Sequence, residues 1–328
     1  MRAVVFDEPG GPEVLHVAEL PDVAARDGEL LIEVAAAGVN RADLLQRRGF
    51  YPPPPGASPI LGLEVAGTVA ALGPGVTGWQ PGERVMALIE GGGYADLAAA
   101  PCAQSVRVPD SIDIISAAGI PEVFITAHDA LFTRAGLQAG ETVLIHGGAG
   151  GVGTAAIQLA ARQECRVIAT AGTEARLERC TELGAGFAIN HREEDFVERV
   201  LEITAGAGAD VVLDVMGAAY LERNLAALAV DGRMVVIATQ GGNSAELNLA
   251  LLMRKRASVI TTMLRARPHA QKARIVAAFD AHALPDLARG ALLAVIDRVV
   301  PLADAATAHR LLEAGEITGK VLLRTGDM

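Results

Sequence analysis

The glycine-rich run of residues 143–161, VLIHGGAGGVGTAAIQLAA, most constrains the fold of this chain. An apolar segment leads into a glycine-rich turn, and a helical pattern follows the turn. Gly148, Gly150 and Gly153 fit the spacing GxGxxG. In such a turn one glycine permits the tight bend, another lets the backbone approach a pyrophosphate, and the third lets the helix begin close to the strand. The pattern favours a dinucleotide-binding turn over its alternative, a turn that only packs a helix on a sheet.

The context of this run is typical of β-α-β units. From about Pro121 longer helical patterns alternate with apolar strands, which predicts a doubly wound parallel sheet of the α/β class. The expected strands are Thr142–His146, Arg166–Thr170, Val211–Val215, Arg233–Ala238 and Ser258–Met263. The expected helices lie near Val152–Gln163, Ala175–Leu183, Asp195–Thr204 and Tyr220–Leu228.

The rest of the chain predicts a second domain of mostly β structure. Up to about Gly119, short apolar or alternating segments are separated by glycine and proline. Near the C-terminus, an amphipathic helical pattern precedes a final strand at Lys320–Arg324. We expect this closing strand to return to the first domain.

Composition narrows the class of protein. The 328 residues are 51% hydrophobic and 20% charged, which is enough apolar sequence for two folded domains. A formal net charge of −11, with no basic run longer than Arg254–Arg256, disfavours partners such as nucleic acid or an anionic membrane surface. Cys102, Cys165 and Cys180 lack the spacing of a disulfide framework or a structural zinc site. Because the N-terminus lacks a signal-peptide core, we expect a cytoplasmic protein with a small-molecule partner.

The end of the second expected strand of the α/β domain bears on which dinucleotide binds. An NAD-binding domain places an Asp or Glu there, about 20 residues after the glycine turn, to bind the ribose 2′-hydroxyl. Here Ala171 and Gly172 stand at that place. Thr173 and Arg176 are suited to a 2′-phosphate, the arginine through two parallel hydrogen bonds. Glu174 would repel that phosphate, but the set as a whole predicts NADPH as the cofactor.

Four segments carry a family resemblance: AAGVNRADLLQRRGFYPPPPGASPILGLEVAG at 36–67, HGGAGGVGTAAIQLA at 146–160, INHREEDF at 189–196 and GKVLL at 319–323. They resemble the medium-chain dehydrogenase/reductase superfamily and, within it, the zinc-independent quinone oxidoreductase branch that includes zeta-crystallin. The resemblance covers nearly the whole chain. It implies a GroES-like, mostly β catalytic domain at 1–120, an NADP-binding Rossmann domain at 121–263 and a return to the catalytic domain at 264–328.

The zinc-dependent members of this superfamily differ at the metal ligands. They carry Cys where Asn40 stands, His where Leu63 stands, and a lobe of four clustered cysteines where this chain has only Cys102. An amide and an alkyl side chain cannot hold a catalytic Zn²⁺. The sequence therefore predicts an enzyme without zinc. Glu64 remains, and we expect it to be a structural residue bound by backbone groups or by an arginine.

In a site without metal, side-chain donors or water must polarise the carbonyl oxygen that gains charge during hydride transfer. The resemblance implies that Asn40 lies beside the nicotinamide and that Tyr51 borders the substrate pocket, so these two are the predicted catalytic residues. Each has a structural alternative. Asn40 is suited to cap a helix beginning at Arg41, and Tyr51 is suited to shield the core as a loop aromatic.

The resemblance also implies a set of cofactor-binding residues. The glycine turn contributes Gly148, Gly150, Gly151, Val152 and Gly153, and the 2′-phosphate end contributes Gly172, Thr173, Arg176 and His191. The others are Asn40, Thr126, Met216, Gly217, Ala238, Thr239, Gln240, Met263, Leu264, Arg265 and Lys320. His191 stands where relatives commonly have Tyr, so cofactor binding is expected to strengthen at lower pH as the imidazole is protonated. Arg176 replaces a Lys, which keeps the charge but changes the geometry.

Together these features predict an NADPH-dependent oxidoreductase that transfers hydride to quinones or related conjugated carbonyls. Two alternatives stay open: an enoyl or enone reductase with a specific conjugated substrate, and a non-catalytic NADPH-binding or crystallin-like protein. The resemblance further implies a homodimer that pairs the edges of two parallel sheets. The apolar, β-branched segment Ser258–Leu264 is suited to such pairing.

Overall fold

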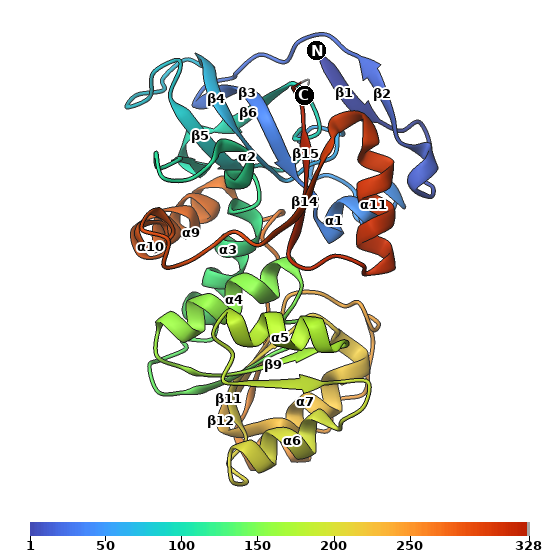
Figure 1. The fold of residues 1–328 in the computed structure, drawn as a ribbon, viewed down its shortest axis with the longest axis vertical. Coiled ribbons are helices and arrows are strands. Elements are labelled where there is room, and N and C mark those ends of the chain that lie inside the picture. Colours follow the sequence, from blue (N-terminus) through green and yellow to red (C-terminus); the bar gives the residue numbers. More distant parts are fainter. Residues whose placement is uncertain (327–328) are drawn as a thin grey trace. The chain divides into compact units, whose positions relative to one another are not determined.

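The computed structural model describes residues 1–326, and the chain divides into two units (Figure 1). The first unit comprises Met1–Ile125 together with the residues from Leu264 onward, and the second comprises Thr126–Met263. Helix α3 (Pro121–His128) contains the first point of division. Among the described residues, no helix combines the length and the apolar character needed to cross a membrane.

The second unit is built on a six-stranded sheet in which every pairing is parallel. The strand order is β10-β9-β8-β11-β12-β13. The bounds are β8 (Thr142–Ile145), β9 (Arg166–Ala171), β10 (Phe187–Asn190), β11 (Ala209–Asp214), β12 (Leu228–Val236) and β13 (Ser258–Thr261). The inner strand β8 is buried along its whole length, as expected for a strand covered on both faces. The predicted doubly wound parallel sheet is confirmed.

Two strands differ from the sequence expectation. β10 is absent from the expected set because its residues, FAIN, form a short segment whose strand character comes from pairing with β9. β12 begins at Leu228 rather than Arg233. Its backbone continues through Asp231, whose φ of 65° makes a bend that sequence patterns indicate as the end of a strand.

The helices of the second unit agree closely with the expected ones. They are α4 (Gly151–Arg162), α5 (Glu174–Glu182), α6 (Phe196–Ile203), α7 (Leu221–Ala227) and the unexpected α8 (Leu249–Lys255), with a π-helical segment at Asp129–Arg134. Asp195 fixes the start of α6, because its carboxylate accepts hydrogen bonds from the backbone N–H groups of Val197 and Glu198. Buried Leu144, Ile168 and other apolar side chains form the core of this unit.

The first unit holds a seven-stranded sheet of mostly antiparallel pairs. The order is β14-β15-β3-β4-β5-β7, and β6 also pairs with β3. The bounds are β3 (Glu29–Gly38), β4 (Glu64–Leu72), β5 (Arg84–Leu88), β6 (Leu97–Pro101), β7 (Ser105–Arg107), β14 (Ile296–Pro301) and β15 (Lys320–Arg324), with β1 (Arg2–Val5) and β2 (His16–Glu19) forming a separate pair. The helices are α1 (Arg41–Arg47), α2 (Ile114–Ala117), α9 (His269–His282), α10 (Leu284–Ala288) and α11 (Ala305–Ala314). The closing strand β15 returns to this unit and pairs antiparallel with β3.

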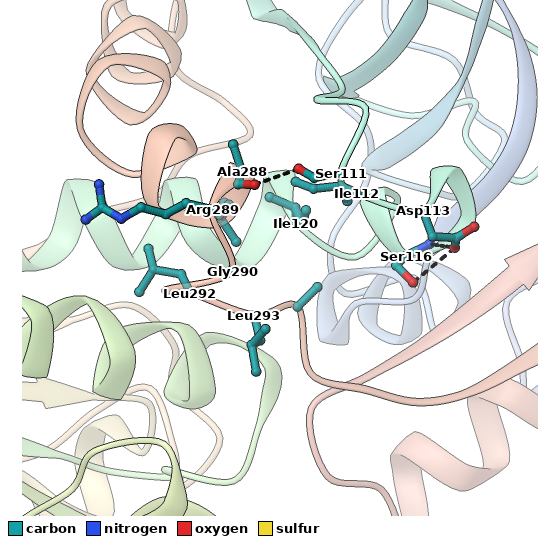
Figure 2. Close-up of a pocket in the computed structure, with 12 residues that line it drawn as sticks. Ser111, Ile112, Asp113, Ser116, Ile120, Ala288, Arg289, Gly290, Leu292 and Leu293 are labelled. Carbon is teal, nitrogen blue, oxygen red and sulfur yellow. Dashed lines mark hydrogen bonds between the residues drawn. The ribbon is translucent and has the colours of Figure 1, made fainter.

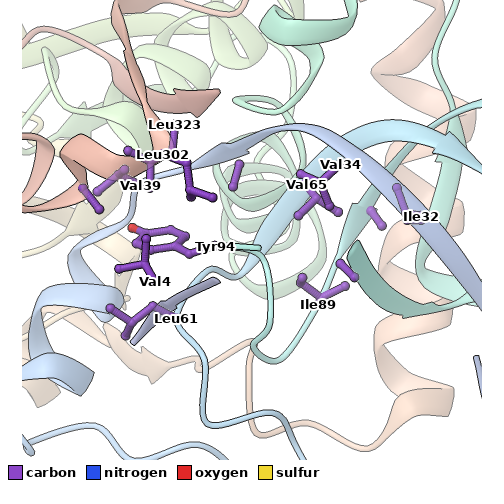
Figure 3. Packing of buried hydrophobic residues seen from close by; sticks show 14 of the residues in the cluster. Val4, Ile32, Val34, Val39, Leu61, Val65, Ile89, Tyr94, Leu302 and Leu323 are labelled. Carbon is purple, nitrogen blue, oxygen red and sulfur yellow. The ribbon is translucent and has the colours of Figure 1, made fainter. Parts of the chain in front are cut away.

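A large aromatic side chain lies in the apolar core of the first unit. Figure 3 shows the ring of Tyr94 beside Val4 and among side chains such as Val39 and Leu302. Tyr94 is fully buried, so its hydroxyl needs a partner inside the protein. That partner is the carboxylate of Asp43, at an O–O distance of 3.1 Å. The core of this unit therefore contains a polar network as well as apolar side chains.

Candidate functional site

The glycine turn of the second unit has the geometry of a cradle for phosphate. Gly147, after β8, has a φ of 65°, so the tight bend falls one residue before the GxGxxG pattern. A Cβ on Gly153 would lie 2.2 Å from the carbonyl oxygen of Gly147, so only glycine lets α4 begin this close to the turn. Gly150 is the N-cap residue of α4, and Gly151 and Val152 form its first turn, where backbone N–H groups are free for an anion.

The residues expected at the 2′-phosphate end also lie together. Gly172 follows β9, and the exposed Thr173 is the N-cap residue of α5, which carries Arg176. A Cβ on Gly172 would lie 2.9 Å from Nε of Arg192 and 3.1 Å from Nε2 of His191. These two basic side chains therefore cover the backbone of Gly172.

The environment of His191 changes the expected pH dependence. Partial burial, followed by the charges of Arg192 and Arg223, lowers the pKa of this imidazole. Protonation of His191 therefore begins at a lower pH than that of a free histidine, and any strengthening of phosphate binding shifts to that lower pH range.

Further predicted cofactor residues follow β11 and β12, two other strands of the same sheet. The buried carboxylate of Asp214, at the end of β11, accepts hydrogen bonds of 2.9 Å from the N–H groups of Met216 and Gly217. Gly217 has a φ of 70°, and a Cβ there would lie 3.0 Å from Cα of Thr239. Ala238, Thr239 and Gln240 follow β12. Because the carboxyl ends of parallel strands meet at one edge, the glycine turn and the residues after β9, β11 and β12 gather there.

Thr126 gives an independent sign of a ligand site in the second unit. Its hydroxyl oxygen is buried and has no hydrogen-bond partner among residues 1–326. A buried hydroxyl without a partner costs free energy, so this group fits a polar ligand. With the glycine cradle, it shows that the residues present suit a dinucleotide. Met263, at the end of the unit, is 55% exposed.

In the first unit, Asn40 lies in a buried charged cluster with Glu64 and Lys320. Nδ2 of Asn40 donates to Oε1 of Glu64 at 2.9 Å and to the carbonyl oxygen of Gly38 at 3.3 Å. Nζ of Lys320 lies 2.7 Å from Oε1 of Glu64 and donates to Oδ1 of Asn40 at 2.5 Å and to the carbonyl oxygen of Val39 at 2.8 Å. Asn40, Lys320 and Glu64 therefore satisfy one another's hydrogen bonds and charges.

This cluster changes what we expected of its members. The backbone N–H of Glu122 also donates to Oε2 of Glu64, at 2.8 Å, so Glu64 is bound by backbone as expected, but its cation is Lys320 rather than an arginine. Both amide donors of Asn40 are in use, which leaves it no N–H for a substrate carbonyl. Asn40 is also the N-cap residue of α1. All three ammonium donors of Lys320 are likewise directed at atoms of the first unit.

A second buried network of the first unit is centred on Asp43 of α1. The carboxylate of Asp43 accepts hydrogen bonds from the N–H groups of Asn40 and Gly62 and from the Tyr94 hydroxyl. Burial raises the pKa of Asp43 to about 6 against these hydrogen bonds. His309 of α11 lies 3.2 Å from the Tyr94 hydroxyl through Nε2 and 3.0 Å from NH1 of Arg47 through Nδ1. Because arginine only donates, Nδ1 of His309 accepts, and the proton of the neutral ring is on Nε2.

Tyr51 is half-buried on the loop after α1, and Arg265 holds that loop. The guanidinium carbon of Arg265 lies 5.3 Å from the centroid of the Tyr51 ring. The same guanidinium donates to the carbonyl oxygen of Glu90 at 2.8 Å and to Oε1 of Gln46 at 2.7 Å. Burial, and then the charge of Glu122, raises the pKa of Tyr51. Arg265 and the half-buried Leu264, both predicted to contact the cofactor, thus belong to the first unit.

The donor set around Asn40 does not fit a zinc ion. Leu63 is apolar and buried, and the Glu64 carboxylate is already paired with an ammonium group. Zinc sites in proteins use thiolate, imidazole and carboxylate ligands. Over the described part of the chain, no group of three or more His, Cys, Asp or Glu residues is arranged to hold a metal ion.

Three residues of these sites are missing from the sequence prediction. Gly147 lies outside the GxGxxG spacing, although the turn bends there. Arg192 lies next to the predicted His191, and the INHREEDF segment was the available signal for it. Glu122 follows Pro121 at the start of a helix in an otherwise apolar run, which is the only sequence sign of its position.

A surface pocket of about 460 Å³ lies elsewhere in the first unit (Figure 2). It is lined by residues in and near α2, by the end of α10 and by the segment that follows it, and the Ser111 hydroxyl donates to the carbonyl oxygen of Ala288. None of the predicted catalytic or cofactor residues lines it. Its lining is largely apolar and does not indicate a ligand.

Comparisons with known proteins agree with both units. Residues 26–110 match the alcohol dehydrogenase GroES-like domain, and residues 151–279 match the zinc-binding dehydrogenase family. Human quinone oxidoreductase is 35% identical over 220 residues, which cover 66% of each chain. A phenolphthiocerol/phthiocerol polyketide synthase of Mycobacterium tuberculosis is 34% identical over 324 residues, which are 97% of this chain but 14% of that protein. The chain therefore spans only a small part of that relative.

Solved structures extend this similarity over nearly the whole chain. The quinone oxidoreductase of Escherichia coli complexed with NADPH is 31% identical, with a TM-score of 0.89, covering 99% of this chain and 100% of that one. An enoyl reductase is 28% identical, with a TM-score of 0.86 and coverage of 99% of both chains. The GroES-like unit, the Rossmann-like unit and these similarities together show that the chain belongs to the medium-chain dehydrogenase/reductase superfamily, in its quinone-reductase-like branch.

Proposed function

We propose that this chain is an NADPH-dependent reductase of quinones or related conjugated carbonyls that works without zinc. The observation that carries the proposal is the edge of the parallel sheet, where the glycine cradle meets a basic 2′-phosphate end without the acidic residue of NAD-binding domains. The similarity to an NADPH-bound quinone oxidoreductase supports the same cofactor.

The residues of the second unit bind and orient NADPH in this proposal. N–H groups of Gly151, Val152 and Gly153 face the pyrophosphate, and Thr173, Arg176, His191 and Arg192 face the 2′-phosphate. The Thr126 hydroxyl takes the polar partner that it lacks. The bound cofactor supplies the hydride.

The residues of the first unit polarise and position the acceptor. Tyr51, with a neutral hydroxyl, is the proposed donor to the acceptor oxygen, and Arg265 fixes the loop that carries it. Asn40 and Lys320 are proposed to act as positioning residues, because their donors are used within the cluster. The Glu64–Lys320 pair takes the place of a metal as the charged centre of this region.

Enoyl or enone reduction is the second candidate, favoured by the similarity to an enoyl reductase and to a polyketide synthase. A quinone and a conjugated enone present the same electrophilic arrangement. Initial rates of cofactor oxidation, measured with a simple quinone and a simple enone and with NADPH and NADH, test both. Turnover of the quinone with NADPH preferred supports the first proposal, turnover of the enone alone supports the second, and tight NADPH binding without turnover of either contradicts both.

The homodimer is proposed to form through β13, the edge strand of the parallel sheet. Among the strands of the described residues, β13 has one partner, β12, and its other side is unpaired. Val259 on this strand is 37% exposed, and Leu249 and Met253 on α8 are 62% and 75% exposed. An apolar edge of this kind favours pairing with a second copy. A monomer in light scattering at micromolar concentration would contradict it. The cytoplasmic location stays a prediction.

A further inference from the structure

Two buried polar residues of the second unit, His146 and Thr170, contact the glycine turn and have no role in the proposed function so far. His146 follows β8 directly and precedes the bend at Gly147. Thr170 is the next-to-last residue of β9. Both residues are 1% exposed. Polar side chains buried this deeply need hydrogen-bond partners inside the protein, and here the partners lie at the glycine turn.

Thr170 binds the bend of the glycine turn at two points. Its Oγ1 accepts the N–H of Gly147 at 3.4 Å, and its carbonyl oxygen accepts the N–H of Gly148 at 2.9 Å. The carbonyl oxygen of Gly147 in turn accepts the N–H of Gly150, the N-cap residue of α4, at 2.9 Å. Thr170 therefore holds the segment from which α4 and its free N–H groups begin.

His146 orients the hydroxyl of Thr170. Nδ1 of His146 lies 3.1 Å from Oγ1 of Thr170, and Nε2 lies 2.7 Å from Oδ1 of Asn224. Burial lowers the pKa of His146 to about 4, so the ring is neutral near pH 7. Because an amide oxygen only accepts, the single ring proton is on Nε2, and Nδ1 accepts from the Thr170 hydroxyl. The lone pairs of Oγ1 are then left for the N–H of Gly147.

The ring of His146 is itself held by the segment that follows β11. It packs edge-on against the rings of Phe196 and Tyr220, with centroids 4.8 and 5.0 Å away. Tyr220 and Asn224 belong to the helical segment that starts at Gly217, one of the predicted cofactor residues. Two hydrogen bonds and two ring contacts fix the orientation of this imidazole. His146 therefore links the glycine turn to the segment after β11.

We propose that His146 and Thr170 are positioning residues that fix the glycine turn in the conformation that receives the cofactor pyrophosphate. This proposal rests on the proposed function. Thr170 sets the bend through Gly147, and His146 acts through the Thr170 hydroxyl. A binding site that is already ordered loses less conformational entropy when its ligand binds, so loss of this pair weakens cofactor affinity. Because NADPH and NADH share the pyrophosphate, both are affected alike.

Thr170→Val tests the proposal, because valine keeps the shape of the side chain and removes the hydroxyl. We expect the Kd of NADPH and that of NADH each to rise about fivefold in a fluorescence titration, from the loss of one hydrogen bond that orders the turn. Thr170→Ser keeps the hydroxyl and should bind both cofactors as the wild type does. His146→Phe keeps the ring contacts, removes the Nδ1 acceptor and should also raise both Kd values. The double variant should bind no more weakly than the weaker single variant, because both residues act through one hydroxyl.

Thr204→Val is the matched control. The buried Thr204 hydroxyl donates to the carbonyl oxygen of Val200 at 2.7 Å and accepts the N–H of Gly208 at 2.8 Å, but it lies between α6 and the amino end of β11. This variant should lower the urea midpoint of unfolding, measured by circular dichroism, and leave both Kd values unchanged.

Two results would overturn the positioning role. One is Kd values for Thr170→Val that equal those of the wild type, which would leave the proposed function standing. The other is an equal rise of the Kd values in Thr170→Val and Thr204→Val, which would trace the effect to lost stability. A wild-type protein that binds neither NADPH nor NADH would instead contradict the proposed function, and the positioning role with it.

Discussion

The candidate sites of the two units differ in the kind of atoms that form them: backbone atoms in the second unit and side-chain atoms in the first. In the second unit the candidate cofactor site is made largely of backbone: glycines, helix N-termini and the carboxyl ends of parallel strands. In the first unit the candidate site is made of buried side chains. Those of Asn40, Glu64 and Lys320 satisfy one another's charges and hydrogen bonds. A backbone site is damaged by added atoms, and a side-chain network is damaged by removing a partner.

The largest expected effect is in the first unit. Lys320→Met leaves the fully buried Glu64 carboxylate without its cation, and we expect the free energy of unfolding to fall by about 3–5 kcal/mol. Urea unfolding followed through Trp79, the single tryptophan of the chain and a residue of this unit, measures the loss. Adding Glu64→Leu to this variant should recover most of it. A loss below about 1 kcal/mol would show that the pair does not stabilise the unit.

The second effect is a pH dependence of the other buried network of the first unit, which joins Asp43, Tyr94 and His309. Burial, and then the charges of Arg47 and Arg48, lowers the pKa of His309 to about 3. Because the unfolded chain binds this proton below about pH 6.5, the contribution of His309 to stability should fall by about 1.4 kcal/mol per pH unit as pH drops from there toward 3. His309→Gln should remove this contribution of about 1.4 kcal/mol per pH unit from the slope of the unfolding free energy against pH. The exposed His16→Gln serves as the control and should leave the slope unchanged. Equal slopes in wild type and His309→Gln would contradict the buried neutral histidine.

The third effect tests the backbone site by adding one carbon. In Gly153→Ala the Cβ would meet the carbonyl oxygen of Gly147, so α4 must shift away from the turn, and overpacking of this kind costs about 1–3 kcal/mol. We expect the Kd of NADPH to rise about tenfold or more in a fluorescence titration. The control is Gly186→Ala, whose Cβ would have its nearest atom, the carbonyl oxygen of Val167, at 3.7 Å. Equal NADPH affinities in the two variants would contradict a role of the glycine turn in binding the cofactor.

The smallest effect concerns Arg192, one of the side chains at the proposed 2′-phosphate end of the backbone site. Arg192→Ala should weaken NADPH binding about tenfold, from the loss of about 1.5 kcal/mol of charged hydrogen bonding to the 2′-phosphate. NADH binding should not change, because NADH lacks that phosphate. Arg179→Ala, which removes an arginine of the same unit that is paired with Glu182, is the control. A parallel loss of NADH affinity would place Arg192 in structural support of β10 instead.

The same contrast explains what the sequence predicts and what it does not. The glycine spacing, the alternating helices and strands and the return of β15 are local patterns, and they locate the Rossmann-like sheet and its candidate cofactor edge. The network of the first unit joins Asn40, Glu64, Glu122 and Lys320 across long stretches of chain, so no spacing reveals it. Family resemblance predicts Asn40 and Lys320 as site residues, but only the geometry shows that their hydrogen-bond donors are used within the cluster.

The most direct test of the central claim is the rate of NADPH oxidation with a simple quinone before and after exhaustive zinc chelation, with NADH run in parallel. The account predicts turnover that prefers NADPH and does not change when metal is removed. Turnover that is lost on chelation and restored by zinc would contradict it, because the Glu64–Lys320 pair would then have to open to admit a metal ion.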